Sequence, residues 1–220
     1  MEALEGIHLI KTINEFFKEH FMKNIVLYII IILSFTVGVS TGALTVNALD
    51  SVQNEELITY LNDFFHIAHT HDINNLQIFK LSVANNMKQV ILLWIFGITV
   101  VGIPFILILI GIKGFVTGFT VGFLIKSFNT NGLFFSIVSI LPQSLIIVPC
   151  FIILGVISIN FSLSTLKNNK KNKFRREDMK SRFIAYSSAV LMILIVLTLG
   201  SFIEAYITPV FIKSVISSFW

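Results

Sequence analysis

The chain has 220 residues, of which 55% are hydrophobic and 13% are charged, with a formal net charge of +4. That charged share is roughly half the usual share of a soluble domain. A soluble protein cannot bury so much apolar surface without a lipid solvent or a large partner, so a free-standing soluble domain is excluded. We expect one polytopic, all-α membrane domain over residues 1–220.

Residues 1–24 are predicted to form a cytoplasmic amphipathic segment. In residues 7–21, apolar side chains recur at helical spacing and charged side chains occupy the other face. This helix either lies along the membrane interface or packs on the cytoplasmic loops of the chain itself. The first 24 residues carry four glutamates and no small-residue cleavage site, which is not the pattern of a cleavable signal peptide.

The first span is predicted over residues 25–48, which contain no charged residue. As a helix they rise about 36 Å, enough to cross hydrocarbon of about 30 Å. Ser34, Gly38 and Gly42 follow at intervals of four and line one face, where they allow close contact with another helix.

Residues 50–82 are polar and carry five acidic residues and one lysine, Lys80. They are predicted to form an exported loop, which follows once the basic residues 164–182 are placed in the cytoplasm. Within it, residues 54–65 read as a short amphipathic helix with Asp50 or Ser51 near its N-cap. The aromatic end of this helix, at Phe64 and Phe65, is expected to rest on the membrane surface or on a partner.

Residues 89–128 form an almost unbroken apolar stretch that would be about 60 Å long as one helix, twice the hydrocarbon thickness. It must turn back, and we place the turn at residues 111–114, where two glycines flank Lys113. The arm from Gly114 to Ile125 is then short and is expected to be tilted or re-entrant.

The next apolar stretch, residues 133–163, is predicted to be one kinked span preceded by a short arm. Proline inside a helix removes a hydrogen bond and kinks or breaks the helix. The predicted helix breaks in the middle of the chain are Pro104, Pro142 and Pro149.

Residues 164–182 are the strongest topological signal, because eight of the sixteen Lys and Arg residues lie between Lys167 and Arg182. The signal is carried chiefly by Lys170, Lys171, Lys173, Arg175 and Arg176. We expect this basic loop to be cytoplasmic, although docking of RNA or DNA is the alternative use of such a loop. The last span is predicted over residues 183–203, with Glu204 at its exit and an exported amphipathic tail over 205–220. Five crossings then place the N-terminus inside and the C-terminus outside.

Three glycines at intervals of four, Gly114, Gly118 and Gly122, make a stripe without side chains. In lipid, such stripes favour helix association through close packing. Together with Gly38 and Gly42 they are predicted to form a helix-packing interface. The stripe serves either packing within the monomer or a contact with a partner or a second copy of the chain, so a homo-oligomer is one expected assembly.

The sequence carries no catalytic arrangement. The predicted spans contain no pair of carboxylates, all five histidines lie outside them, and the chain has no nucleotide-binding glycine loop. His66, His69 and His71 are expected to be exposed loop residues; zinc binding is the alternative, but neither CxxC nor HExxH accompanies them. The single cysteine, Cys150, permits no intramolecular disulfide. We expect no enzyme activity, no cofactor, no metal site and no nucleic-acid partner.

Two classes of function remain, a scaffold and a small-molecule transporter or permease. Broken helices at the prolines are typical of transporters, but a transporter usually has more polar lining at depth than Lys113, Gln143, Asn160 and Ser144 provide. A continuous polar cavity would favour a transporter, and a tightly packed core would favour a scaffold.

The order and spacing of several segments resemble the stage II sporulation protein M family. The matching segments are GALTVNAL (42–49), NEELITYLNDFF (54–65), NNMKQVILLWIFGITVVGIP (85–104), GIKGFVTGFTVGF (111–123) and ILPQSLIIVPCFIILG (140–155). Some wider relatives have a histidine after the first proline of the last segment and a glutamate before the second. Here those positions are Gln143 and Val148, which argues against a proton-linked role.

The resemblance implies a membrane scaffold in endospore formation that acts in engulfment at the sporulation septum. Its implied partners are the peptidoglycan-degrading stage II sporulation proteins D and P, together with the lipid bilayer. Because wall-degrading enzymes work outside the membrane, we expect an exported partner surface that includes Phe64, Phe65, Phe211 and Phe219.

Overall fold

The computed structural model describes residues 21–70, 74–170 and 176–210, and every element in these ranges is helical. The side chains of residues 64–70, 167–170 and 176–178 lie outside the description. The predicted amphipathic segment 7–21 lies almost wholly outside the described residues. The described side chains do not include the basic residues Lys170, Lys171, Lys173, Arg175 and Arg176, which carry the topological signal. They also do not include Phe64, Phe65, Phe211 and Phe219.

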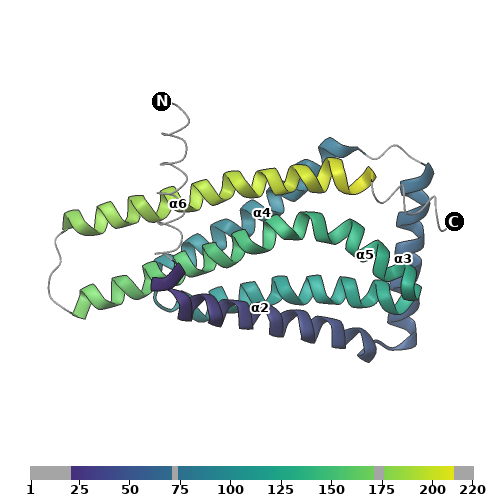
Figure 1. Cartoon of the computed structure of the whole chain (residues 1–220), viewed down its shortest axis with the longest axis horizontal. Helices are drawn as coiled ribbons and strands as arrows, with labels where there is room; N and C mark the ends of the chain where they lie inside the picture. The colour runs from purple at the N-terminus through teal and green to yellow at the C-terminus, as the bar shows by residue number, and fades with distance from the viewer. Residues whose placement is uncertain (1–20, 71–73, 171–175, 211–220) are drawn as a thin grey trace.

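Helix α2 (Ile25–Thr45), extended by the short 3₁₀ helix η1 (Val46–Ala48), corresponds to the predicted first span. Helix α3 (Ser51–Thr70) follows and lies across one end of the bundle (Figure 1). Helices α4 (Asn75–Ile98) and α5 (Gly102–Lys170) then run through the bundle, and α6 (Arg176–Phe202) returns along it into η2 (Ile203–Ile207), a π-helical turn. We call the end crossed by α3 the α3 end, and the other end the opposite end.

Four helices among the described residues are long and apolar enough to cross a membrane. One of them, α5, has 69 residues and would be about 100 Å long if straight. It folds back at Asn129, whose φ of 50° and ψ of −127° are not helical. Positive φ is rare for residues other than glycine, and asparagine is among the residues that tolerate it best. The fold is therefore all-α and polytopic, as predicted, with α2, α4, α6 and two arms of α5 as its long segments.

The predicted turn at residues 111–114 is wrong. Residues 102–128, the first arm of α5, are helical throughout, and the chain reverses at residues 99–101 and at Asn129 instead. The glycines around Lys113 serve helix contact rather than a turn, because a Cβ on Gly114 would lie 2.3 Å from the carbonyl oxygen of Phe35 in α2.

The helix break predicted at Pro104 lies just before this residue, at residues 99–101 between α4 and α5, whereas the breaks predicted at Pro142 and Pro149 are wrong. Pro104 lies in the first turn of α5, where its missing N–H would have had no helical partner in any case. Pro142 and Pro149 lie inside the second arm, residues 130–170, and the backbone remains helical across both. Since Asn129 provides the reversal, the second arm is one long helix.

The exported loop predicted over residues 50–82 is mostly helical. Helix α3 extends beyond the predicted 54–65, and α4 already begins at Asn75. Asp50 caps α3, since the backbone N–H of Gln53 donates to Asp50 Oδ1 at 2.7 Å, as predicted. The last span is longer than predicted, because its helix continues through Glu204 to Val210.

Helix α2 and the first arm of α5 approach until their backbones touch. A Cβ on Gly38 or Gly42 would lie 2.1 Å from a carbonyl oxygen of α5, and one on Gly118 would lie 2.1 Å from the carbonyl oxygen of Val39. Gly122 faces Ala43 in the same way. The glycine stripe of each helix therefore packs against the backbone of the other helix within the same chain.

Lys126 ties the reversal at Asn129 to the end of α2, because its Nζ donates to the carbonyl oxygen of Val46 at 2.7 Å. Toward the opposite end, the hydroxyl of Tyr186 in α6 lies 3.0 Å from Ser158 Oγ of the second arm and donates to the carbonyl oxygen of Trp94 in α4 at 3.1 Å. These contacts join three segments around a core whose most buried members are Ile31, Leu93, Ile106, Ile110, Leu154 and Leu197.

Replacement of Gly118 by alanine should destabilise the protein. The added Cβ meets backbone that cannot move aside, and overpacking of this kind typically costs about 1–3 kcal/mol. Thermal unfolding of the purified protein in detergent should show a lower midpoint for Gly118→Ala. The matched control is Gly111→Ala, whose new Cβ would meet Ser34 Oγ at an ordinary 3.4 Å. Equal midpoints for the two variants would contradict the proposed contact.

Candidate functional site

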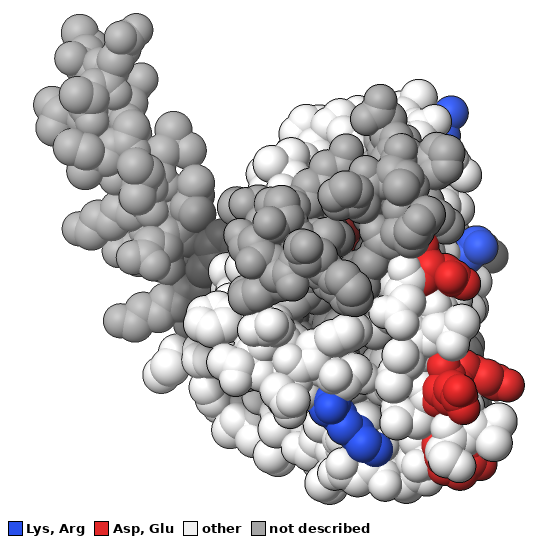
Figure 2. Space-filling view, turned by 90° about the vertical axis from the view of Figure 1, so that its right-hand side faces the viewer, with Lys and Arg blue, Asp and Glu red and all other residues white. Residues whose placement is uncertain are grey.

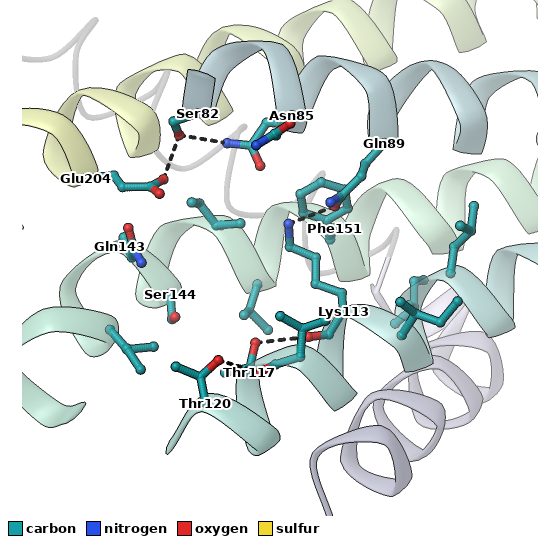
Figure 3. A pocket seen from close by; sticks show the side chains of 18 of the residues that line it. Ser82, Asn85, Gln89, Lys113, Thr117, Thr120, Gln143, Ser144, Phe151 and Glu204 are labelled. Atoms are coloured by element: carbon teal, nitrogen blue, oxygen red, sulfur yellow. Dashed lines mark hydrogen bonds between the residues drawn. The ribbon is translucent and has the colours of Figure 1, made fainter. Parts of the chain in front are cut away.

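A polar cavity of about 380 Å³ lies between α4, the two arms of α5 and η2 (Figure 3). Three of its walls are apolar in part, but polar side chains reach it from every element. Those polar lining residues are Ser82, Asn85, Asn86 and Gln89 of α4, Lys113, Thr117 and Thr120 of the first arm, Gln143 and Ser144 of the second arm, and Glu204 of η2. A volume of this size is in the range of small-molecule sites.

Glu204 occupies one end of the cavity. Ser82 Oγ donates to Glu204 Oε2 at 2.6 Å. The amide of the buried Asn86 donates to Ser201 Oγ at 3.0 Å and, more weakly, to Ser82 Oγ at 3.5 Å. The carboxylate is thus held against α4 rather than marking the exit of the last span. It belongs to a π-helical turn, a feature that occurs frequently at functional sites.

Lys113 occupies the other end (Figure 3). Its Nζ donates to Gln89 Oε1 at 2.8 Å and lies 3.9 Å from the centroid of the Phe151 ring. A cation over an aromatic face is attracted by the ring quadrupole. Lys113 lies about 17 Å along the first arm from Gly102, so it is far from both helix ends. Ionisable side chains at such depth are costly and usually have a function.

Gln143 adds an unsatisfied acceptor. Its Oε1 is buried and has no hydrogen-bond partner. The side chain comes from the second arm and lies on the Glu204 side of the cavity (Figure 3). A buried carbonyl without a donor costs about 1–3 kcal/mol, so this oxygen is available to accept a hydrogen bond from a molecule in the cavity.

The cavity is closed toward the opposite end. Leu93 and Ile110 line it and are each only 1% exposed. Beyond them the core residues Ile106 and Leu154 are fully buried. The cavity therefore reaches from the α3 side to about the middle of the bundle and no further.

The family model described as Stage II sporulation protein M matches residues 31–209. The chain belongs to the stage II sporulation protein M family. The match begins within α2 and covers α3, α4, α5, α6 and η2. No curated protein and no solved structure matches the chain. The protein is accordingly a membrane protein of a sporulation family.

Few of the residues singled out in the sequence of this family member lie at the cavity. Lys113, Gln143, Ser144 and Glu204 do, whereas Asn160 does not. The five glycines lie at the contact between α2 and the first arm. Ser82, Asn86 and Gln89 were missed, although their spacing of four and three already places them on one helical face. Ser82 falls within the predicted exported loop, and the sequence does not show which residues of distant segments this face meets.

Asn86 should matter for stability while its neighbour Asn85 should not. Asn86→Leu removes the hydrogen bonds to Ser82 and Ser201, and such bonds in membrane proteins contribute about 0.6 kcal/mol each on average. We expect a loss of about 1 kcal/mol in the free energy of unfolding in detergent. Asn85→Leu, at an exposed position of the same helix, is the control and should stay within about 0.5 kcal/mol. Equal losses would rule out a special role for the Asn86 contacts.

Proposed function

We propose that this protein is a non-enzymatic membrane scaffold in endospore formation. It is needed for engulfment, and it recruits or anchors peptidoglycan-degrading partners, the stage II sporulation proteins D and P, at the septal membrane. Membership of the stage II sporulation protein M family supports the process. The observation that carries the scaffold role is α3, an amphipathic helix that lies across one end of the bundle.

Helix α3 is amphipathic and packs closely against none of the other described helices. Asn54, Leu57, Ile58 and Leu61 are half-buried along one face, while Glu55, Glu56, Tyr60 and Asp63 are exposed on the other. Acidic side chains gather on one side of the surface at the α3 end (Figure 2). A helix with one half-buried apolar face and one exposed acidic face, lying across the end of a membrane bundle, is suited to rest at the membrane surface and to present its exposed face to a partner.

The proposed orientation puts the α3 end outside the cell. The basic segment 164–182 includes the end of α5 and the start of α6, which lie at the opposite end of the bundle, and basic segments favour the cytoplasm. Five crossings then give a cytoplasmic N-terminus and an exported C-terminus. In this orientation α3 and the end of α6 lie on the side where the cell wall is, which is where peptidoglycan-degrading partners act.

One observation favours the second candidate, a small-molecule permease. The polar cavity reaches from the α3 side to mid-bundle and holds two opposite charges. A permease also needs a way out, and the cavity stops at the buried Leu93 and Ile110. The scaffold therefore remains the better-supported function, and the cavity is considered below as a binding site.

Replacement of the aromatic residues at the exported ends should release the partners. We expect the combined variant Phe64→Ser, Phe65→Ser, Phe211→Ser and Phe219→Ser to lose most co-purification with stage II sporulation proteins D and P from sporulating cells. Val52→Ser, at an exposed position near the start of α3, is the control and should retain both partners. Full recovery of both partners with the aromatic variant, at normal protein level, would count against the scaffold.

The orientation can be tested by labelling single cysteines in intact cells with a membrane-impermeant maleimide. In a Cys150→Ser background, Tyr60→Cys on the exposed face of α3 should react without permeabilisation. Lys180→Cys, which is exposed near the start of α6, should react only after permeabilisation. The reverse pattern would place the basic loop outside and overturn the proposed docking side.

A further inference from the structure

We propose that the polar cavity binds a zwitterionic ligand, with an ammonium group between Glu204 and Gln143 and an anionic group on Lys113. The inference does not depend on the scaffold role, because it rests only on the chemistry of the cavity walls. Figure 3 places the acceptors of Glu204 and Gln143 on one side and the ammonium of Lys113 on the other.

At the Glu204 end of the cavity, the hydrogen-bond acceptors are not all paired with donors. Glu204 Oε2 receives the Ser82 hydroxyl, while Gln143 Oε1 is buried and receives nothing. The two side chains come from η2 and from the second arm, and both lie on the same side of the cavity (Figure 3). A carboxylate and a carbonyl around a gap match an ammonium group, which carries a positive charge and up to three N–H donors.

The Lys113 end offers the complementary group. An ammonium has three donors, and Gln89 Oε1 accepts one of them. The Phe151 ring lies against the same nitrogen and holds it in place through its negative face. A carboxylate or phosphate of the ligand would accept a remaining donor, and charge-assisted hydrogen bonds of this kind are about twice as strong as neutral ones.

The balance of charge selects a zwitterion over an ion. Lys113 and Glu204 are the two charged residues among the described lining, and they cancel. A ligand with net charge would leave one charge of the cavity without a partner, and a partly buried charge without a partner is unfavourable. A zwitterion adds no net charge and matches each end with its opposite.

Two sources carry this chemistry. One is the headgroup of phosphatidylethanolamine, which would enter sideways from the bilayer, and the other is a free amino acid from the water on the α3 side. Ile112, Val116 and Thr120 line the cavity and are exposed, so the cavity has a rim on the outer surface of the first arm. The experiment below separates the two sources.

The test is binding of two soluble probes to the full-length protein in detergent, measured by isothermal titration calorimetry. Glycerophosphoethanolamine represents the lipid headgroup, and L-alanine represents the free zwitterion. We expect one of them to bind. Glycerophosphocholine has the same charges but no ammonium N–H, so it should bind at least tenfold more weakly than glycerophosphoethanolamine if the lipid headgroup is the ligand.

Three variants locate the site. Lys113→Met and Glu204→Gln should each weaken binding of that probe at least tenfold. Gln143→Leu should do the same, and it sacrifices no existing hydrogen bond of Oε1, so it tests the site even if the charge variants fold poorly. Lys88→Met is the matched control, because Lys88 is an exposed lysine of α4 that does not line the cavity. Binding of neither probe to the wild-type protein, or equal binding to all four variants, would overturn the proposal.

Discussion

The contact between α2 and the first arm of α5 is the interaction on which the rest of the structure depends. In hydrocarbon, the hydrophobic effect does not drive apolar helices together, so their association depends on close packing. The glycines at this contact let a carbonyl of one helix enter the space where the other would carry a side chain. This face of the first arm is occupied by α2. The helical period places Lys113, Thr117 and Thr120 on roughly the opposite face, where they line the cavity.

Polar residues complete the bundle on its other side. The amide of Asn86, the hydroxyls of Ser82 and Ser201 and the carboxylate of Glu204 join α4 to the end of α6. Tyr186 makes the corresponding link toward the opposite end. The apolar core lies between the hydrogen bonds of Glu204 and those of Tyr186. Polar side chains line the cavity toward the α3 end, and buried apolar side chains close it toward the opposite end. A binding site open to one side is compatible with a scaffold that senses or retains a small molecule while it holds partners.

Much of the fold follows from composition and hydrophobic length. The first span, the capping of α3 by Asp50 and the all-α class were predicted correctly from residues 25–48, 50–65 and the apolar total. The turns were not. A glycine pair around Lys113 and an asparagine at 129 both look like turn residues, and local chemistry cannot rank them. Only the position of α2 decides, because it needs Gly114 for contact and leaves Asn129 free to reverse the chain.

Composition and local pattern are enough to show that this is a membrane protein, to place its first span and to indicate its family. These properties depend on apolar runs and on the order of segments along the chain, without reference to any distant contact. The shared cavity of Glu204, Gln143 and Lys113, in contrast, is visible only in the folded chain. These residues lie on three segments far apart in the chain, and their meeting depends on the reversal at Asn129 and on the extension of α6 through its π-helical turn.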